Sequence, residues 1–158
     1  MAEHFFSIYC IITLMHKNFY ASGFLYHPQS QQILLQQNNS IANMSSPWLL
    51  FGGHYSEKEE PEALFKNIVS KLLDIEVGVV HPIYSYLNEN NDAFQYIVYS
   101  KLSKFQNFSS RNGLTFGWFS FKEVLKLRVT EQTKHDIVVG QRVIEAAVRK
   151  SLGEHTFQ

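Results

Sequence analysis

The amino-acid sequence predicts a single α+β domain, and three observations support this fold class. Short apolar and aromatic runs, separated by turn residues, have the length and composition of β-strands. Two longer segments, Pro61 to Leu73 and Glu131 to Leu152, repeat apolar residues at helical spacing. The chain has 158 residues, which is near the common size of one domain, and no internal repeat or linker divides it.

Two β-hairpins are expected from strand-forming runs on either side of a turn. The first covers Ala21 to Gln37 with its turn at His27 to Ser30. The second joins Ile83–Leu87 to Phe94–Leu102 through an Asn-rich turn. Because the last of these runs is apolar on both faces, we expect it to be a central strand. Two further short strands are expected at Trp48 to Phe51, stopped by Gly52 and Gly53, and at Phe116 to Phe119.

The helix expected at Pro61 to Leu73 has Pro at its first position behind an acidic entry. Its apolar spacing should turn five residues inward: Leu64, Phe65, Ile68, Val69 and Leu72. A short helix is expected at Lys122 to Leu127. The long helix from Glu131 to Leu152 should bury a stripe made of Ile137, Ile144, Val148 and Leu152, and Thr133 with Asp136 has the spacing of a capping box.

The charge balance argues against several kinds of partner. Fourteen basic residues balance fourteen acidic residues, so no global field would steer the chain onto DNA or an anionic membrane. We therefore expect neither a DNA nor a membrane partner, and any phosphate recognition must be local. Cys10 is the only cysteine, which excludes an intramolecular disulfide and is typical of a cytoplasmic protein.

The ends of the chain are expected to differ from the domain between them. Residues 1–20 are interpreted as an N-terminal extension and residues 153–158 as a flexible tail of one domain that covers 1–158. The apolar stretch Phe5 to Met15 is too short to span a bilayer. Glu3 and His4 precede it where a signal peptide would carry Lys or Arg, so we expect a buried strand or helix there.

The order of these elements, together with one local motif, resembles the Nudix (MutT-like) superfamily. The signature of that family is G-x5-E-x7-R-E-U-x-E-E-x-G-U, where U is a bulky aliphatic residue. Trp48 to Gly53 resembles the usual strand and Gly-Gly entry, and Gly53 stands six residues before Glu59. Farther on, Trp118 to Ser120, followed by Glu123, Val124 and Leu127, resembles the strand-to-helix segment of many members. The resemblance extends from about Ala21 to Leu152 and implies a mixed β-sheet sandwiched between helices.

In the family, three glutamates of the signature helix bind Mg²⁺, which neutralises a diphosphate and activates water. Counted from Glu59, the three glutamate positions are Ile68, Lys71 and Leu72, and the arginine position is Asn67. No shifted register restores the acids, because Glu62 is the only acidic residue between Pro61 and Leu73. The sequence therefore predicts a degenerate motif, with Gly53 and Glu59 as remnants and no further catalytic residue assigned.

Three functions remain open. The first is a binder of a nucleotide-like or phosphorylated ligand with little or no hydrolase activity and no cofactor. Its candidate ligand-binding residues are His54 and Tyr55, on the loop facing the family's cleft, and Lys71, as a point charge for phosphate. Alternatively, His54 and Tyr55 are ordinary loop residues, and Lys71 is a solvent-exposed helix residue with no specific role.

The second function is a hydrolase of a nucleoside diphosphate linked to another moiety, with Mg²⁺ or Mn²⁺ held by displaced ligands. Glu57, Glu59 and Glu62 are the candidate metal ligands, although acids at this place also simply complement a helix N-terminus. The third is a protein-interaction module whose cleft is filled by side chains. His135 beside Asp136 is not taken as an acid-base pair, because neighbours on a helix point about 100° apart.

Overall fold

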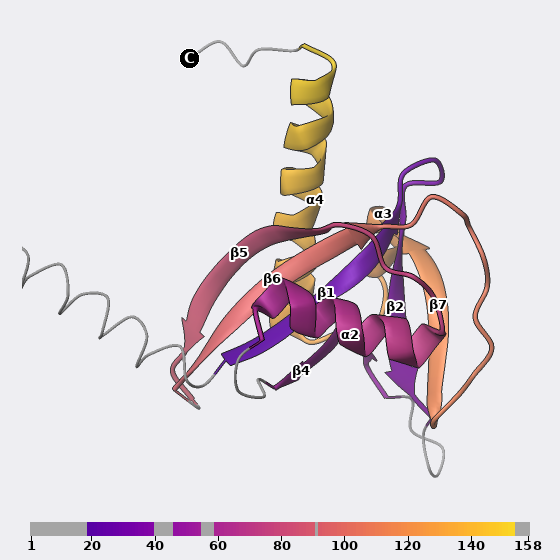
Figure 1. The fold of residues 1–158 in the computed structure, drawn as a ribbon, viewed down its shortest axis with the longest axis vertical. Helices are drawn as coiled ribbons and strands as arrows, with labels where there is room; N and C mark the ends of the chain where they lie inside the picture. Colours follow the sequence, from indigo (N-terminus) through magenta and orange to yellow (C-terminus); the bar gives the residue numbers. More distant parts are fainter. Residues whose placement is uncertain (1–18, 40–45, 55–58, 91, 154–158) are drawn as a thin grey trace, which may run out of the picture.

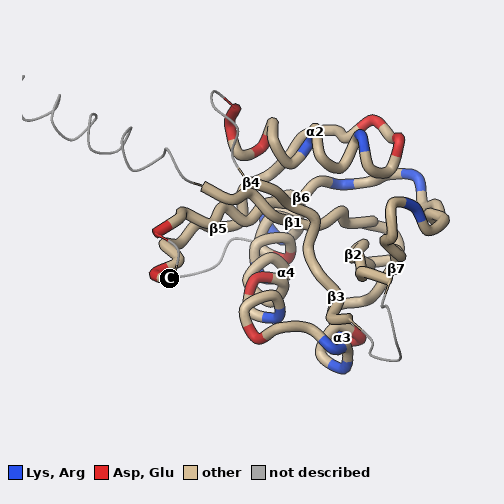
Figure 2. Tube along the Cα trace, turned by 90° about the horizontal axis from the view of Figure 1, so that it is seen from below, with Lys and Arg blue, Asp and Glu red and all other residues tan. Residues whose placement is uncertain are grey.

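The computed structural model describes residues 19–39, 46–54, 59–90 and 92–153. One mixed β-sheet lies between two helices, with α2 (Pro61–Leu73) on one face and α4 (Glu131–Ser151) on the other (Figures 1 and 2). The strands are β1 Phe19–His27, β2 Gln32–Asn38, β3 Trp48–Leu49, β4 Phe51–His54, β5 Val80–Asn88, β6 Ala93–Lys101 and β7 Leu114–Ser120. A four-residue helix, α3 (Phe121–Val124), connects β7 to the segment before α4. The α+β class and the sheet between helices are confirmed.

The sheet is organised around β1 and β6, which pair in parallel. β6 has β1 on one side and antiparallel β5 on the other, so the predicted central strand is confirmed. β1 pairs with two different strands along its other edge. Its first half is antiparallel to β4, and its last three residues form the predicted hairpin with β2. β7 then pairs with β2 on the side away from β1.

α2 has the predicted bounds because its sequence supplies both ends. Pro61 occupies the first turn, and the chain leaves the helix at Asp74 in a left-handed conformation with φ 54°. Leu64, Phe65 and Val69 are buried against the sheet, whereas the inward-facing Ile68 and Leu72 are only partly buried at its margins. The helix therefore covers β1, β4, β5 and β6 through one apolar stripe.

α4 begins at Glu131 as predicted and ends at Ser151, one residue early, but its cap and the end of its buried stripe differ from the prediction. The Thr130 side chain accepts a hydrogen bond from the backbone N–H of Thr133, so the cap lies at Thr130 and the Thr133–Asp136 capping box is wrong. Ile137 and Ile144 are buried as predicted, but Val148 is 47% exposed and Leu152 is 71% exposed. The helix is longer than the sheet it covers, and Figure 1 shows its C-terminal half extending beyond the sheet.

The remaining predictions concern the short helix and the chain ends. α3 begins one residue earlier and ends three residues earlier than predicted, and a capping box between Ser120 and Glu123 sets its start. β1 begins at Phe19, so the strand includes the last two residues of the predicted N-terminal extension, Phe19 and Tyr20. The apolar stretch Phe5 to Met15 lies outside the described residues. Within the described ranges, no helix has both the length and the hydropathy required to cross a membrane.

Candidate functional site

A row of four polar and aromatic side chains crosses the sheet on its α4 face. Strand register places His54 of β4 opposite Tyr20 of β1, Tyr20 opposite Gln95 of β6, and Gln95 opposite Tyr86 of β5. We call these four residues the polar row. Neighbouring strands lie about 4.8 Å apart, so the row spans about 14 Å. Its members alternate in phase with Phe24, which packs in the core cluster beneath α4, and therefore share that face.

The character of this face changes along the strands. Two residues farther along, the next row contains Ser22, Ile97 and Tyr84, and the row after it contains Phe24, Tyr99 and His81. This last row is apolar and aromatic because α4 covers it, and the rings of Phe24 and Tyr99 are stacked. The polar row lies beyond that cover. α4 thus covers the middle of the face and leaves the end with Tyr20 and Gln95 to polar side chains.

The members of the polar row differ in exposure. Gln95 is buried, Tyr20 and Tyr86 are partly exposed, and His54 is exposed. The rings of Tyr20 and His54 meet edge to face with centroids 4.9 Å apart. Within the described part of the chain, neither the Gln95 amide nor the hydroxyls of Tyr20 and Tyr86 have a hydrogen-bond partner. No described residue therefore occupies these donors and acceptors.

The N-terminal half of α4 borders the polar row through a buried carboxylate. Asp136 is only 4% exposed, and its Oδ1 accepts hydrogen bonds from the Tyr84 hydroxyl and, at 2.9 Å, from Gln132 Nε2. Burial raises the pKa of Asp136, while the hydrogen bonds from Tyr84 and Gln132 act in the opposite direction. This network fixes the start of α4 against β5.

The same environment keeps the neighbouring phenols protonated. Burial, followed by the charge of Asp136, raises the pKa of Tyr86 to about 12. Burial and the hydrogen bond to Asp136 also raise the pKa of Tyr84. Both hydroxyls are therefore hydrogen-bond donors at neutral pH, and Tyr86 is the one that remains without a protein acceptor among the described residues.

The signature positions lie where α2 meets β4. Gly53 is in β4, and a Cβ atom on it would lie 2.6 Å from Ile68 Cδ1. Ile68 packs with the cluster of Phe19, Ala21 and Leu64, and Leu72 packs with the other core cluster on this face. Lys71 is exposed in the last turn of α2, where its charge complements the helix dipole. Two of the three positions thus carry hydrocarbon side chains in packed surroundings, and neither offers a lone pair to a metal.

The acids at the entry to α2 are only partly described. Glu59 Oε1 accepts a hydrogen bond of 3.4 Å from Asn67 Nδ2, so the signature's first glutamate position contacts its arginine position. Burial raises the pKa of Tyr96, and Glu60 and then Glu62 raise it further, which places their charges near β6. Glu57 and Tyr55 lie outside the described residues. No three His, Cys, Asp or Glu side chains of the described ranges are grouped as metal ligands would be.

The structure separates two of the residues proposed to bind a ligand. His54 belongs to the polar row on the α4 face, whereas Lys71 is on α2, which covers the other face. They do not form one site. The sequence analysis did not identify the other members of the row. A signal for Gln95 was present, since it alternates in phase with the apolar residues Ile97 and Tyr99.

Comparison with known proteins identifies the fold. No family model matches the chain, and no curated protein is similar enough to count as a match. Many solved structures do match. A MutT/Nudix family protein from Listeria innocua has 14% sequence identity and a TM-score of 0.63, with 86% of this chain and 97% of that chain covered. The ORF135 protein of E. coli has 16% identity and a TM-score of 0.62, with 81% and 92% covered.

A third similar structure contains a ligand. The Nudix domain of Shewanella oneidensis NrtR, solved in complex with ADP-ribose, has 13% identity and a TM-score of 0.62 over 80% of this chain and 87% of that chain. At such identities the likeness establishes architecture, because function depends on the residues of the site. The described part of the chain has a Nudix-like fold.

Proposed function

We propose that this protein binds a nucleotide-like ligand across the polar row and carries out little or no metal-dependent hydrolysis. The row itself is the observation that carries the proposal. It offers a phenol, an imidazole, an amide and a second phenol within about 14 Å, which is the length of a nucleoside with one or two phosphates. The rings supply flat apolar area, and the amide and hydroxyls supply directional hydrogen bonds.

The surroundings of the row favour reversible binding. Asp136 fixes Tyr84 and the start of α4, so the adjacent surface is formed before a ligand arrives and little ordering is needed on binding. Because Tyr86 remains protonated, it can donate a hydrogen bond to a carbonyl, a ring nitrogen or a phosphate oxygen. The ADP-ribose in the NrtR domain supports a ligand of this class.

The proposal of weak or absent hydrolysis rests on the signature helix. Magnesium requires hard oxygen ligands in near-octahedral geometry, and Ile68 and Leu72 present hydrocarbon at the places where the hydrolases carry carboxylates. Lys71 adds a positive charge between them along the helix. These residues do not fit a Mg²⁺ site.

A ligand screen by thermal unfolding tests the binding proposal. ADP-ribose and nucleoside mono-, di- and triphosphates are added to the full chain with and without Mg²⁺. A ligand at about a hundredfold excess over its Kd adds about 2.7 kcal/mol, or roughly 5–10 °C in Tm for a domain of this size. Gln95→Leu and Tyr86→Phe should reduce the shift, whereas Tyr99→Phe, which changes a phenol beneath α4, should retain it.

Two outcomes would replace this function. If Mg²⁺ or Mn²⁺ drives release of a nucleoside monophosphate, and Glu59→Gln and Glu62→Gln abolish that release, the acids at the entry to α2 form a displaced metal site and the chain is a hydrolase. If no nucleotide shifts the Tm and the variants of the polar row are inert, a protein-interaction module becomes the better explanation.

A further inference from the structure

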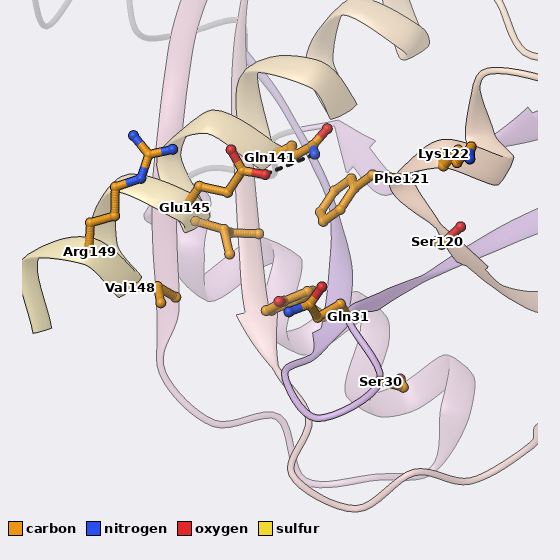
Figure 3. Close-up of a pocket in the computed structure, with 11 residues that line it drawn as sticks. Ser30, Gln31, Ser120, Phe121, Lys122, Gln141, Glu145, Val148 and Arg149 are labelled. Atoms are coloured by element: carbon orange, nitrogen blue, oxygen red, sulfur yellow. Dashed lines mark hydrogen bonds between the residues drawn. The ribbon is translucent and has the colours of Figure 1, made fainter. Parts of the chain in front are cut away.

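A cavity of about 430 Å³ lies beside the C-terminal half of α4, away from the polar row. Its walls come from the turn between β1 and β2, from the junction of β7 with α3, and from α4 (Figure 3). This volume is within the range of small-molecule sites. Asp136, which borders the polar row, and Glu145, which lines the cavity, are nine residues apart on α4, or about 13 Å along its axis.

The floor of the cavity is made of packed apolar and aromatic side chains. Tyr26 and Ile144 are buried, and both line the cavity together with Phe121. The Tyr26 and Phe121 rings have centroids 6.0 Å apart and are tilted by 35°. Val148, half-exposed on α4, adds an aliphatic wall. These surfaces give a flat or branched apolar group area against which it can pack.

Charges of both signs line the rim. Lys122 of α3 and Arg149 of α4 lie on opposite sides of the cavity in Figure 3, and Glu145 lies between them on α4. The Glu145 carboxylate is oriented by Gln141 Nε2, which donates to its Oε1 at 3.0 Å. Within the described ranges, none of the three charges is neutralised by an ion pair. A purely anionic guest would meet Glu145, and a purely cationic guest would meet two cations.

The turn contributes a residue in an unfavourable conformation. Gln31 has φ 54°, a left-handed conformation that Gly or Asn adopts at far lower cost. The four-residue turn requires this conformation, but it does not require glutamine. The Gln31 side chain lines the cavity. The cavity thus has a glutamine side chain at a position where glycine would cost less backbone free energy, and its amide can hydrogen-bond to a ligand.

We propose that this cavity is a second binding site, for a small zwitterion with an apolar body, of the kind represented by an aromatic α-amino acid. The carboxylate faces Lys122 or Arg149, the ammonium group faces Glu145, and the side chain rests on Tyr26, Phe121 and Val148. The cavity shares no residue with the polar row, and this proposal does not depend on nucleotide binding by the polar row.

Three probes with the same phenyl group separate the contributions of the two charges, and a fourth tests the size of the apolar group. L-Phenylalanine carries both groups, 3-phenylpropionate lacks the ammonium group, phenethylamine lacks the carboxylate, and L-tryptophan enlarges the ring. Titrations of the full chain followed by amide NMR should show L-phenylalanine binding at millimolar concentration or better, in the range expected for so small a ligand. Either single-charge analogue should bind about tenfold more weakly.

Matched variants assign each charge to a side chain. Glu145→Gln should weaken the binding of L-phenylalanine and leave the binding of 3-phenylpropionate unchanged or stronger. Lys122→Gln combined with Arg149→Gln should weaken the binding of both carboxylates, L-phenylalanine and 3-phenylpropionate. The controls Lys126→Gln, Arg142→Gln and Glu76→Gln change exposed charges that do not line the cavity and should have no effect. None of these variants should alter the nucleotide-induced Tm shift, which keeps failure of this site distinct from failure of the polar row.

Gln31→Gly provides a second readout. Glycine relieves the left-handed conformation, so the Tm should rise or stay level while affinity for L-phenylalanine falls. If Gln31 served only the turn, the substitution would not lower the affinity for L-phenylalanine. The proposal is overturned if neither amino acid perturbs the resonances of the cavity residues at about 10 mM. It is equally overturned if L-phenylalanine binds and the charge variants and controls behave alike.

Discussion

Single glycines allow close approach both between strands of the sheet and between the sheet and α2. A Cβ atom at Gly23 would overlap the backbone carbonyl oxygen of Val98 on the paired strand β6, and a backbone atom in a central strand has no room to move. A Cβ at Gly53 meets only the end of the Ile68 side chain, which can change rotamer. Both glycines permit close packing, but only Gly23 is held by rigid neighbours.

We therefore expect Gly23→Ala to lower the free energy of unfolding by about 3 kcal/mol or more. Gly53→Ala should cost only about 1 kcal/mol, the price of an altered rotamer. Urea denaturation of both variants measures the difference. Equal losses at the two positions would show that the β1–β6 contact is more adaptable than its geometry indicates.

The buried Asp136 gives a pH dependence of stability. Its folded pKa is raised above the ordinary value of about 3.9, so the folded state holds the proton more tightly than the unfolded state. The stabilising contribution is complete below the unfolded pKa and is lost as pH rises through the folded pKa. Relative to Asp136→Asn, the natural protein should therefore lose stability between about pH 4 and its folded pKa.

Parallel denaturation of the natural protein and Asp136→Asn from pH 3.5 to 7 tests this, because the shared titrations of other groups cancel in the difference. If the natural protein instead becomes more stable relative to Asp136→Asn as the pH rises, the hydrogen bonds from Tyr84 and Gln132 lower the pKa of Asp136 by more than burial raises it. In that case the carboxylate is a net stabiliser of the start of α4.

Among the helices and strands, α4 combines two different environments. Its first half packs on the sheet through Ile137 and Gly140, and a Cβ at Gly140 would lie 2.9 Å from the Phe24 ring. Its second half extends beyond the sheet, where Leu152 is 71% exposed (Figure 1). The cavity lies at the transition between the two halves.

The two halves should respond differently to truncation of one aliphatic side chain. Ile137→Ala removes buried methyl groups and should cost about 2–4 kcal/mol. Leu152→Ala removes an exposed side chain and should change stability by about 0.5 kcal/mol or less. Thermal and urea unfolding of the two variants provide the comparison. A large loss from Leu152→Ala would show that something covers this end of α4 in solution.

At the scale of the whole molecule, the sheet separates two kinds of surface. The α2 face is closed by core clusters that include the signature positions Ile68 and Leu72. The α4 face is closed only in its middle, with the polar row at one end and the cavity at the other. Both proposed sites therefore lie on the same face, on either side of the packed part of α4.

This arrangement predicts the response to magnesium. Millimolar Mg²⁺ should leave the Tm of the natural protein unchanged, since the packed signature positions supply no oxygen ligands. The triple change Ile68→Glu, Lys71→Glu, Leu72→Glu should destabilise the fold by several kcal/mol, because carboxylates replace partly buried hydrocarbon. If the triple variant still folds, Mg²⁺ should raise its Tm. A rise in the natural protein instead would indicate a metal site elsewhere in the chain.

The sequence by itself determined most of the elements and their order. The strand expected at Trp48 to Phe51 was wrong in detail, because it is two strands, β3 and β4, and Gly52 and Gly53 lie within β4 instead of ending it. α2 was predicted at its observed bounds because Pro61 and the apolar spacing act within a few neighbouring residues. The central position of β6 followed from apolar residues on both of its faces. The signature spacing from Gly53 to Glu59 and the later Trp118 segment pointed to the fold that the solved structures show.

Only the tertiary structure decided the sites. The polar row unites residues from four strands, and their alignment depends on register, which periodicity along one strand does not specify. Asp136 meets Tyr84, 52 residues away in the sequence, instead of capping its own helix. Val148 and Leu152 continue the apolar stripe of α4 but stay exposed, because the helix outruns the sheet. Local spacing fixes which face a side chain occupies on its own element, whereas the neighbours it meets depend on how distant segments pack.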